Sequence, residues 1–364
     1  MKKITLLISG LFLFCSVFSQ DYLARARKAK EWGAITMDGS WAINPQFERM
    51  NDFSEGLAAV KKNGEWGFVD AKGSFVVNPQ FDDAHDFHEG LAAVKKGKEW
   101  GFVDKTGSWQ INPQFENVKD FDENIAAVRS GGEWGYIDNK GKYQINPQFT
   151  RISNFSEGLA CVQKDKQWGF IDKAGSWVIN PQFEDAEGFK NGLAFVKKGG
   201  EWGVVDEKGS YVINPQFVKI LDFSNGLAAV KVGKEWGFVD KKGSYVINPQ
   251  FHNAHSFMDG LAAVKKDKEW GFVNSKGKYY INPQFVNVLD FYEGLSAVKK
   301  GKEWGFVDGK GTWIINPQYE KVRNFKNGIA MVRKDGEWGW INKTGTYIIN
   351  PQFPNAYPFV KVGK

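Results

Sequence analysis

Two pairs of histidines are the residues of this chain whose type and spacing come closest to a metal site. His85 and His88 are separated by two residues, and so are His252 and His255. This spacing can bind a metal on a helix, but no helix is predicted at either pair, and the pairs lie too far apart in the chain to form one site. Because two nitrogens alone rarely make a zinc site, we expect solvated loop histidines, no metal and no cofactor.

The other candidates for chemistry are acidic turns and one cysteine. Turns such as Asp70-Ala71-Lys72-Gly73 resemble calcium loops only weakly, since no second acid stands at ligand spacing. Asp at the first position and Gly at the last are typical of a tight turn. Cys161 replaces an alanine that recurs at the equivalent places in the chain, which indicates a small buried side chain. No phosphate loop and no nucleophile with a base is apparent, so the sequence predicts a protein that is not an enzyme.

A row of aromatic side chains is the remaining candidate for ligand binding. Aromatic residues recur at one constant interval from position 41 to position 347, and nine of the ten are Trp or Tyr, which favour sites with one wet end. The rings could pack between neighbouring units, which is the usual use of such a row in a repeat array, or they could stack against sugar rings or peptide side chains. The possible stacking residues are Trp41, Trp109, Tyr143, Trp177, Tyr211, Tyr245, Tyr279, Trp313 and Tyr347.

A single repeated unit must position all of these side chains. Trp-Gly occurs ten times at the interval from Trp32 to Trp66, up to Trp338, without insertion or deletion, and Asn-Pro-Gln-Phe recurs in step with it. A glycine beside a strand aromatic leaves a gap into which a neighbouring ring can settle. We therefore expect the tryptophans to form a continuous structural core, whose inner members are Trp66, Trp100, Trp134, Trp168, Trp202, Trp236, Trp270 and Trp304.

Glycine and proline decide between helices and strands inside the repeat. Several glycines and a central proline in each copy would cost a helical hairpin several kcal/mol, at about 1 for each glycine and about 3 for proline. Alternation instead predicts strands at 57–62 and 65–70, joined by an Asn-Gly turn. A third strand at 74–78 should end at Pro79, which cannot donate to a ladder. The residues that follow are predicted to form a loop.

Comparison of the ten copies separates core positions from surface positions. Position 53 and its equivalents are always Phe, which is the uniformity that a close-packed core demands. Position 51 and its equivalents vary widely, including His85, Lys119, Glu187 and Leu221. Nothing fixed is required there, so we expect this position to be solvated surface.

The repeated motif resembles a known family. Lys-x-x-Glu-Trp-Gly-Phe-Val-Asp-x-x-Gly, then Ile-Asn-Pro-Gln-Phe, then Phe-x-Glu-Gly-Leu-Ala-Ala-Val is similar to the WG-repeat (Trp-Gly containing β repeat) family of bacterial exported proteins. The resemblance covers nearly the whole chain after residue 20. It implies a β-rich repeat protein, often exported, whose role is binding, and it places no catalytic residue on this sequence.

The N-terminus and the charge bear on location. Lys2 and Lys3 precede an apolar run from Ile4 to Phe14, which predicts a signal peptide over residues 1–20 and export to the periplasm, cell surface or medium. No later segment is long and apolar enough to span a membrane after signal cleavage. The 48 Lys and Arg against 42 Asp and Glu give a formal net charge of +6. This charge is small and spread along the chain, which argues against nucleic acid as a partner.

Together these observations predict one all-β domain over residues 21–364, a tandem array of ten three-stranded units. An open superhelical β-solenoid is favoured over a closed propeller-like ring, because residues 23–28 and 359–362 each supply a strand that could cap an end. We expect a non-catalytic scaffold that binds a protein partner. The alternative is binding of cell-wall or envelope polysaccharide through the Trp/Tyr row.

Overall fold

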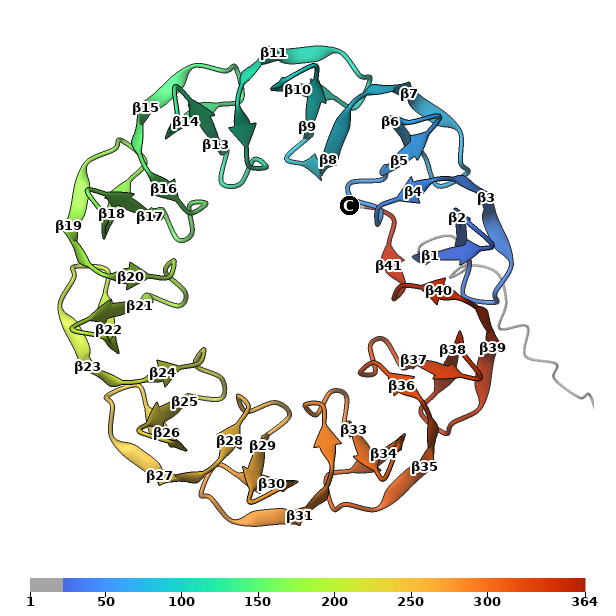
Figure 1. Cartoon of the computed structure of the whole chain (residues 1–364), viewed down its shortest axis with the longest axis vertical. Coiled ribbons are helices and arrows are strands. Elements are labelled where there is room, and N and C mark those ends of the chain that lie inside the picture. Colours follow the sequence, from blue (N-terminus) through green and yellow to red (C-terminus); the bar gives the residue numbers. More distant parts are fainter. Residues whose placement is uncertain (1–21, 364) are drawn as a thin grey trace, which may run out of the picture.

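Short alternating segments separated by glycine turns fold into 41 strands in the computed structural model, which describes residues 22–363. These residues contain no helix, and so none that is long and apolar enough to cross a membrane. The predicted signal peptide lies outside the described residues. The strands form ten antiparallel sheets, or blades, which follow one another around a closed ring (Figure 1).

Four strands of each blade are ordered from the centre of the ring outward, and the first blade has a fifth strand, β41 (Val360–Lys361) (Figure 1). The short innermost strands are β4 (Arg49–Met50), β8 (Asp83–His88), β12 (Asn117–Val118), β16 (Arg151–Ile152), β20 (Asp185–Ala186), β24 (Lys219–Ile220), β28 (Asn253–Ala254), β32 (Asn287–Val288), β36 (Lys321–Val322) and β40 (Asn355–Ala356). The second strands are β1 (Tyr22–Lys28), β5 (Ala58–Lys62), β9 (Leu91–Lys96), β13 (Ile125–Ser130), β17 (Leu159–Lys164), β21 (Leu193–Lys198), β25 (Leu227–Val232), β29 (Leu261–Lys266), β33 (Leu295–Lys300) and β37 (Ile329–Lys334).

The two outer strands of each blade carry the Trp-Gly and Asn-Pro-Gln-Phe motifs. The third strands are β2 (Glu31–Ile35), β6 (Glu65–Val69), β10 (Glu99–Asp104), β14 (Glu133–Asp138), β18 (Gln167–Asp172), β22 (Glu201–Asp206), β26 (Glu235–Asp240), β30 (Glu269–Asn274), β34 (Glu303–Asp308) and β38 (Glu337–Asn342). The outermost strands are β3 (Trp41–Phe47), β7 (Phe75–Phe81), β11 (Trp109–Phe115), β15 (Tyr143–Phe149), β19 (Trp177–Phe183), β23 (Tyr211–Phe217), β27 (Tyr245–Phe251), β31 (Tyr279–Phe285), β35 (Trp313–Tyr319) and β39 (Tyr347–Phe353).

The prediction of three strands per unit is wrong. The residues after the third strand, which were predicted to form a loop, include the innermost strand of the next blade. In β4 this strand is two residues long, with Arg49 opposite Lys61 and Met50 opposite Val60. Two residues carry no visible alternation, so sequence pattern could not reveal them. Each repeat therefore contributes three strands to one blade and one to the next, which ties neighbouring blades covalently and by hydrogen bonds.

The tight turns follow from their sequences. Asn63 and Gly64 both have positive φ, 53° and 82°, as the two-residue turn of a β-hairpin with right-handed twist requires. At the next turn, the Asp70 carboxylate accepts hydrogen bonds from the backbone N–H groups of Lys72 and Ser74, each at 2.9 Å. Turn chemistry therefore accounts for these aspartates.

The outermost strand is bulged where proline lies. β7 continues through Pro79 to Phe81, so the predicted end of this strand at residue 78 is wrong. Trp66 lies opposite Phe81 and Phe68 opposite Val77, which leaves three residues of β7 facing one residue of β6. Proline is tolerated because the strand is at the edge of the sheet and the bulge needs no N–H there.

The bulge also explains the glycine of Trp-Gly. A Cβ on Gly67 would lie 2.5 Å from the carbonyl oxygen of Val77 and 2.6 Å from the nitrogen of Pro79. The glycine therefore makes room for the backbone of the bulged outer strand, where the sequence predicted room for a neighbouring ring.

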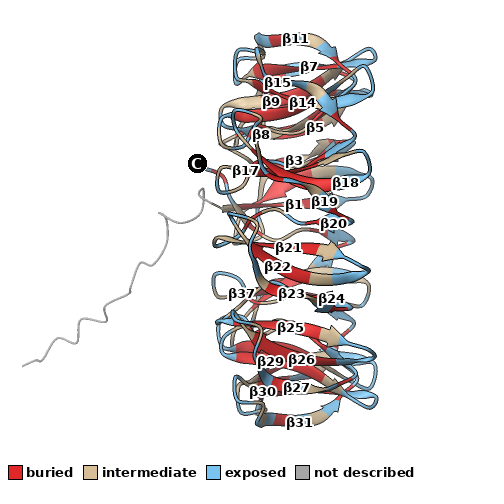
Figure 2. Cartoon of the chain, turned by 90° about the vertical axis from the view of Figure 1, so that its left-hand side faces the viewer, coloured by how far each residue is buried: buried red, intermediate tan, exposed pale blue. Residues whose placement is uncertain are grey.

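The core lies between adjacent blades and repeats around the ring. One cluster joins Trp66, Phe68 and Phe81 of one blade to Phe87 and Val94 of the next. Side-on, buried residues run through the blades and exposed residues gather in the turns at both ends (Figure 2). Of the eight inner tryptophans, Trp66, Trp100, Trp168, Trp236 and Trp270 are buried, whereas Trp134, Trp202 and Trp304 are half-buried. Each contributes to an inter-blade cluster of mainly Phe, Val and Ala.

The prediction of an open solenoid is wrong: the chain is a closed ten-bladed β-propeller. Strand β1 pairs with β40, with Ala26 opposite Ala356, and also with β41 (Val360–Lys361). Figure 1 shows the first and last strands side by side. The terminal segments proposed as separate caps thus cap each other, because the last repeat supplies the innermost strand that the first blade lacks. Joining the ends pairs the inner edge of β1, which an open array would leave exposed.

Candidate functional site

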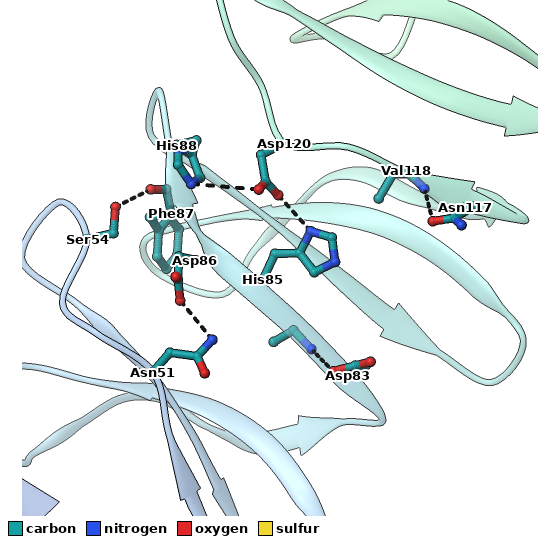
Figure 3. A network of polar contacts seen from close by, with 11 residues as sticks. Asn51, Ser54, Asp83, His85, Asp86, Phe87, His88, Asn117, Val118 and Asp120 are labelled. Atoms are coloured by element: carbon teal, nitrogen blue, oxygen red, sulfur yellow. Dashed lines mark hydrogen bonds and ion pairs between the residues drawn. The ribbon is translucent and has the colours of Figure 1, made fainter. Parts of the chain in front are cut away.

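Polar side chains of consecutive blades meet near the inner ends of the sheets (Figure 3). His85 Nδ1 lies 2.7 Å from Asp120 Oδ1, and His88 Nε2 lies 3.7 Å from Asp120 Oδ2. One blade earlier, the Asn51 side chain donates a hydrogen bond to Asp86 at 3.0 Å. We call the contacts that join position 51 of one repeat to position 52 of the next, such as His85–Asp120 and Asn51–Asp86, the inner-rim pairs.

The second histidine pair repeats part of this geometry. His255 Nδ1 lies 2.7 Å from Asp290 Oδ1, and its ring lies 4.8 Å from that of Trp270. His252 accepts a hydrogen bond from the backbone N–H of Asp267 at 2.9 Å. Within residues 22–363 no group of three or more His, Cys, Asp or Glu side chains could hold a metal ion.

The expectation that position 51 is free surface holds only in part, because Glu187 and Arg323 are exposed but the other eight copies are half-buried. The His85 side chain is 35% exposed and its ring packs 4.8 Å from that of Trp100, while Leu221 and Leu289 pack against core clusters. At several copies the residue is matched to a neighbour in the next blade, as His85 is to Asp120 and Asn51 is to Asp86. The signal in the sequence was a His followed 35 residues later by an Asp, which is found at both inner-rim histidines.

The surroundings of His85, Asp86 and Cys161 shift the pKa values of these side chains. The hydrogen bond to Asp120 raises the pKa of His85, and the charges of Asp120, Asp83 and Asp86 add to this against the opposing effect of burial. Burial raises the pKa of Asp86. Burial also raises the pKa of the Cys161 thiol, whose residue is only 3% exposed. A buried thiol held in its neutral form is a poor nucleophile.

A second polar contact between blades, formed by Glu55, was not predicted from the sequence. The Glu55 carboxylate accepts a hydrogen bond from the backbone N–H of Gly90 at 3.0 Å and pairs with Lys105 Nζ at 3.1 Å. Glu55 itself is in the left-handed region with φ of 51°. We call this arrangement the carboxylate clamp. In the sequence, the clamp corresponds to a Glu followed 50 residues later by a Lys. This spacing has no meaning until the structure shows which turns lie side by side.

The predicted stacking aromatics lie one per blade on the outermost strands, so the ring does not bring them together. Trp109, Tyr211 and Tyr245 are exposed, and the other members of the row are half-buried. Most pack edge-to-face on the blade before: the Trp109 ring lies 5.6 Å from that of Phe81, and the Trp177 ring 5.8 Å from that of Phe149. The Trp41 ring makes the same contact with Phe353 across the closure, at 5.6 Å.

Solved structures similar to this chain share little of its sequence. One described as "Crystal structure of the eukaryotic initiation factor" is 10% identical, with a TM-score of 0.53, over 94% of this chain and 99% of that chain. Another, "Dihydro-heme d1 dehydrogenase NirN in complex with DHE", is 10% identical, with a TM-score of 0.36, over 73% of each chain. The first likeness shows a shared fold alone, and no conclusion is drawn from the second. No curated protein sequence matches the chain.

A family model described as "WG containing repeat" matches the chain in ten consecutive segments. They are residues 32–66, 66–100, 100–134, 134–168, 168–202, 202–236, 236–270, 270–304, 304–338 and 338–363. These matches confirm the resemblance seen in the repeated motif. The chain therefore belongs to the family of WG containing repeat proteins.

Proposed function

We propose that this propeller is a non-catalytic scaffold that binds a protein partner through its outer edge. The observation that supports this is a row of exposed apolar side chains at position 42 of the repeats, on the outermost strands. We call it the outer belt: Val76, Val178, Val246, Tyr280, Ile314 and Ile348. Their exposure runs from 39% for Ile348 to 56% for Tyr280. Exposed apolar residues that gather in one region are typical of interaction surfaces, and Val246, Tyr280, Ile314 and Ile348 lie on four successive blades.

A pair of lysine substitutions in the outer belt tests this proposal. Val246→Lys with Tyr280→Lys places charge on two neighbouring blades, at side chains whose exposure leaves the core untouched. We expect a protein that copurifies with the parent chain from cell-envelope extract to be lost. Asn248→Lys, on the same strand at another exposed position, is the matched control and should retain it. The same bound proteins with all three baits would contradict the proposal.

A second candidate is polysaccharide binding through the aromatic row, because Trp109, Tyr211 and Tyr245 are exposed and such rings can stack on sugars. The tryptophan emission of the chain should then change on addition of peptidoglycan fragments or envelope polysaccharide. Trp109→Ala should reduce this change, and Trp168→Phe at a buried site should not. An unchanged spectrum at saturating polysaccharide would reject this candidate.

Export is part of the same proposal, and residues 1–20 carry it through their charged and apolar segments. Expression of the full chain in a Gram-negative host should yield a processed product outside the inner membrane. A Leu6→Arg and Leu7→Arg variant should stay inside the cell at full length. Full-length product in the cytoplasm for both would show that the segment is not a signal peptide. Neither nucleic acid nor a cofactor enters the proposed function.

A further inference from the structure

The carboxylate clamp recurs wherever the repeat supplies both Glu and Lys. The Glu123 carboxylate lies 3.3 Å from the backbone nitrogen of Gly158 and 3.0 Å from Lys173 Nζ. The Glu293 carboxylate lies 2.9 Å from the nitrogen of Gly328 and 3.1 Å from Lys343 Nζ. With the clamp at Glu55, three sites show how an ammonium and one or two backbone N–H groups of the next blade hold a carboxylate.

A fourth site has the donors without the acid. Lys241 and Gly226 occupy the positions of Lys105 and Gly90, but Asn191 stands where Glu55 would be. Among the described residues, no hydrogen bond or ion pair reaches Lys241 Nζ or the Gly226 backbone N–H. Asn191 keeps the left-handed backbone of the clamp, with φ of 53°. The loop therefore retains its shape while its negative charge is missing.

The same place holds a large cavity between blades. A pocket of about 700 Å³ is lined by Asn191, Gly226 and Lys241 together with Leu193, Phe195 and Phe223. Beside the clamp at Glu123, a pocket of about 410 Å³ shares three of these repeat positions, which are Glu123, Ile125 and Lys173. The missing carboxylate thus coincides with a larger opening.

An exchange of large and small residues gives this pocket its apolar wall. Across β21 and β22, Phe195 lies opposite Val204, whereas most equivalent pairs are Ala and a large aromatic, such as Ala59 opposite Phe68. Phe68 packs on the Phe of the next blade at 4.7 Å. Because Val204 offers no ring, Phe223 lies 6.3 Å from Phe195 and is half-buried. The Phe residues equivalent to Phe223 are buried in the other nine repeats.

We propose that this pocket binds a carboxylate that carries an apolar group. The Gly226 N–H and Lys241 hold the carboxylate as their counterparts hold Glu55, and Phe195 and Phe223 contact the apolar part. The chemistry is that of an apolar amino acid with a free carboxyl group, either as a free molecule or as the C-terminal residue of a polypeptide. This site lies apart from the outer belt, so the inference stands independently of the proposed function.

Acidic groups on the pocket wall affect whether a free amino acid or the C-terminal residue of a polypeptide binds. Asp222 is neutralised by Lys190, whose Nζ lies 2.6 Å away, whereas no ion pair reaches Glu187 within residues 22–363. Both acids line the pocket. The Glu187 carboxylate is thus available to an ammonium group, which a free amino acid has and an acylated residue lacks.

Calorimetric titration of the purified chain with N-acetyl-L-phenylalanine tests the carboxylate. We expect one site per chain, and at least about tenfold weaker binding of N-acetyl-L-phenylalaninamide, because hydrogen bonds to a charged group are lost. Measurable and equal binding of the acid and the amide would overturn the proposal.

Two variants locate the site. Asn191→Glu restores the internal carboxylate found in the other clamps, so it should abolish binding of the acid while the thermal midpoint stays at or above that of the parent. Lys241→Gln should weaken binding at least about tenfold. Lys173→Gln, the same change in a filled clamp, is the matched control and should leave the affinity unchanged. Undiminished binding to Asn191→Glu would refute the assignment.

L-phenylalanine and the tripeptide Gly-Gly-Phe distinguish the two sources. Tighter binding of L-phenylalanine than of its N-acetyl form, lost in Glu187→Gln, identifies a free amino acid. Tighter binding of the tripeptide, lost on C-terminal amidation, identifies a polypeptide terminus. Either result supports the carboxylate site. Failure of all three acids to bind would reject this site and leave the outer-belt experiment unaffected.

Discussion

At the scale of single residues, positions that look variable or incidental prove to be fitted to the adjacent blade. His85 varies between copies as a surface residue would, yet it meets Asp120 at 2.7 Å and Trp100 at 4.8 Å. Glu55 and its equivalents take a left-handed backbone and use the carboxylate to hold the next turn. The chemistry of these residues depends on a neighbour about one repeat away, so a single copy is not a sufficient context for interpreting it.

The raised pKa of His85 predicts a pH-dependent contribution to stability. A pKa that is higher in the folded chain means that the protonated form is favoured by folding, so the contribution is present below the unfolded pKa of about 6.5 and is lost as the pH rises through the folded value. His85→Gln should therefore lower the thermal midpoint more at pH 5.5 than at pH 8.5, as measured by circular dichroism.

The Asp120→Asn background provides the control for this prediction. With the partner carboxylate removed, the extra loss of midpoint that His85→Gln causes at pH 5.5 should become smaller, because the largest cause of the raised pKa is gone. An undiminished difference between the two pH values without Asp120 would assign the effect to another group.

At the scale of elements, the bulged outer strand explains the most regular feature of the sequence. Strand β7 passes over Gly67 closely enough to exclude a side chain there. The bulge places Pro79 at the edge of the sheet, and the bend carries the chain onward to the innermost strand of the next blade. The glycine of Trp-Gly therefore contacts the backbone at Asn-Pro-Gln-Phe in the same blade. Because each motif requires the other, the two recur in step.

Replacement of this glycine should be severely destabilising. Gly67→Ala should lower the free energy of unfolding by about 3 kcal/mol, because the new methyl group meets backbone atoms that cannot change rotamer. Gly309→Ala is the control, since its Cβ would meet only Leu261 Cδ1 at 3.7 Å, and should change stability by less than about 0.5 kcal/mol. Urea denaturation followed by tryptophan emission measures both, and similar midpoints would show that the outer strand moves aside.

At the scale of the whole molecule, ring closure uses the parts found at the other junctions, with two local additions: the pairing of β41 with β1 and the contacts of Arg25. β40 supplies the innermost strand of the first blade, and the Trp41–Phe353 contact repeats the edge-to-face pair of other blades. Arg25, which stands where the other copies have mostly Ala, stacks 3.6 Å from the ring centroid of Tyr357 and pairs with Asp52 at 2.7 Å. The closing junction therefore gains a cation–π contact that the other copies, which have no Arg at this position, cannot make.

A disulfide across the junction tests closure directly. Arg27 lies opposite Asn355 in the antiparallel register, so Arg27→Cys with Asn355→Cys should form an intramolecular disulfide under mild oxidation. Arg27→Cys with Lys321→Cys, which moves the second cysteine to the equivalent position one repeat earlier, should not. Mass spectrometry of the oxidised, alkylated chain distinguishes the two, and absence of the first disulfide would indicate an open array.

The amino-acid sequence by itself determined the local structure: the constant repeat interval, the strands around Trp-Gly, the turns with positive φ and the family. These depend on nearest neighbours in the chain, and ten copies allow each position to be compared with itself. Only the tertiary structure decided that the array closes, that a two-residue strand crosses between blades, and which distant turns share a clamp. Closure depends on a small rotation between blades that must sum to a full circle, and no local pattern encodes that angle. The pocket beside Asn191 is likewise a feature of the tertiary structure alone, since Asn191, Gly226 and Lys241 come from three separate turns that meet only in the folded ring.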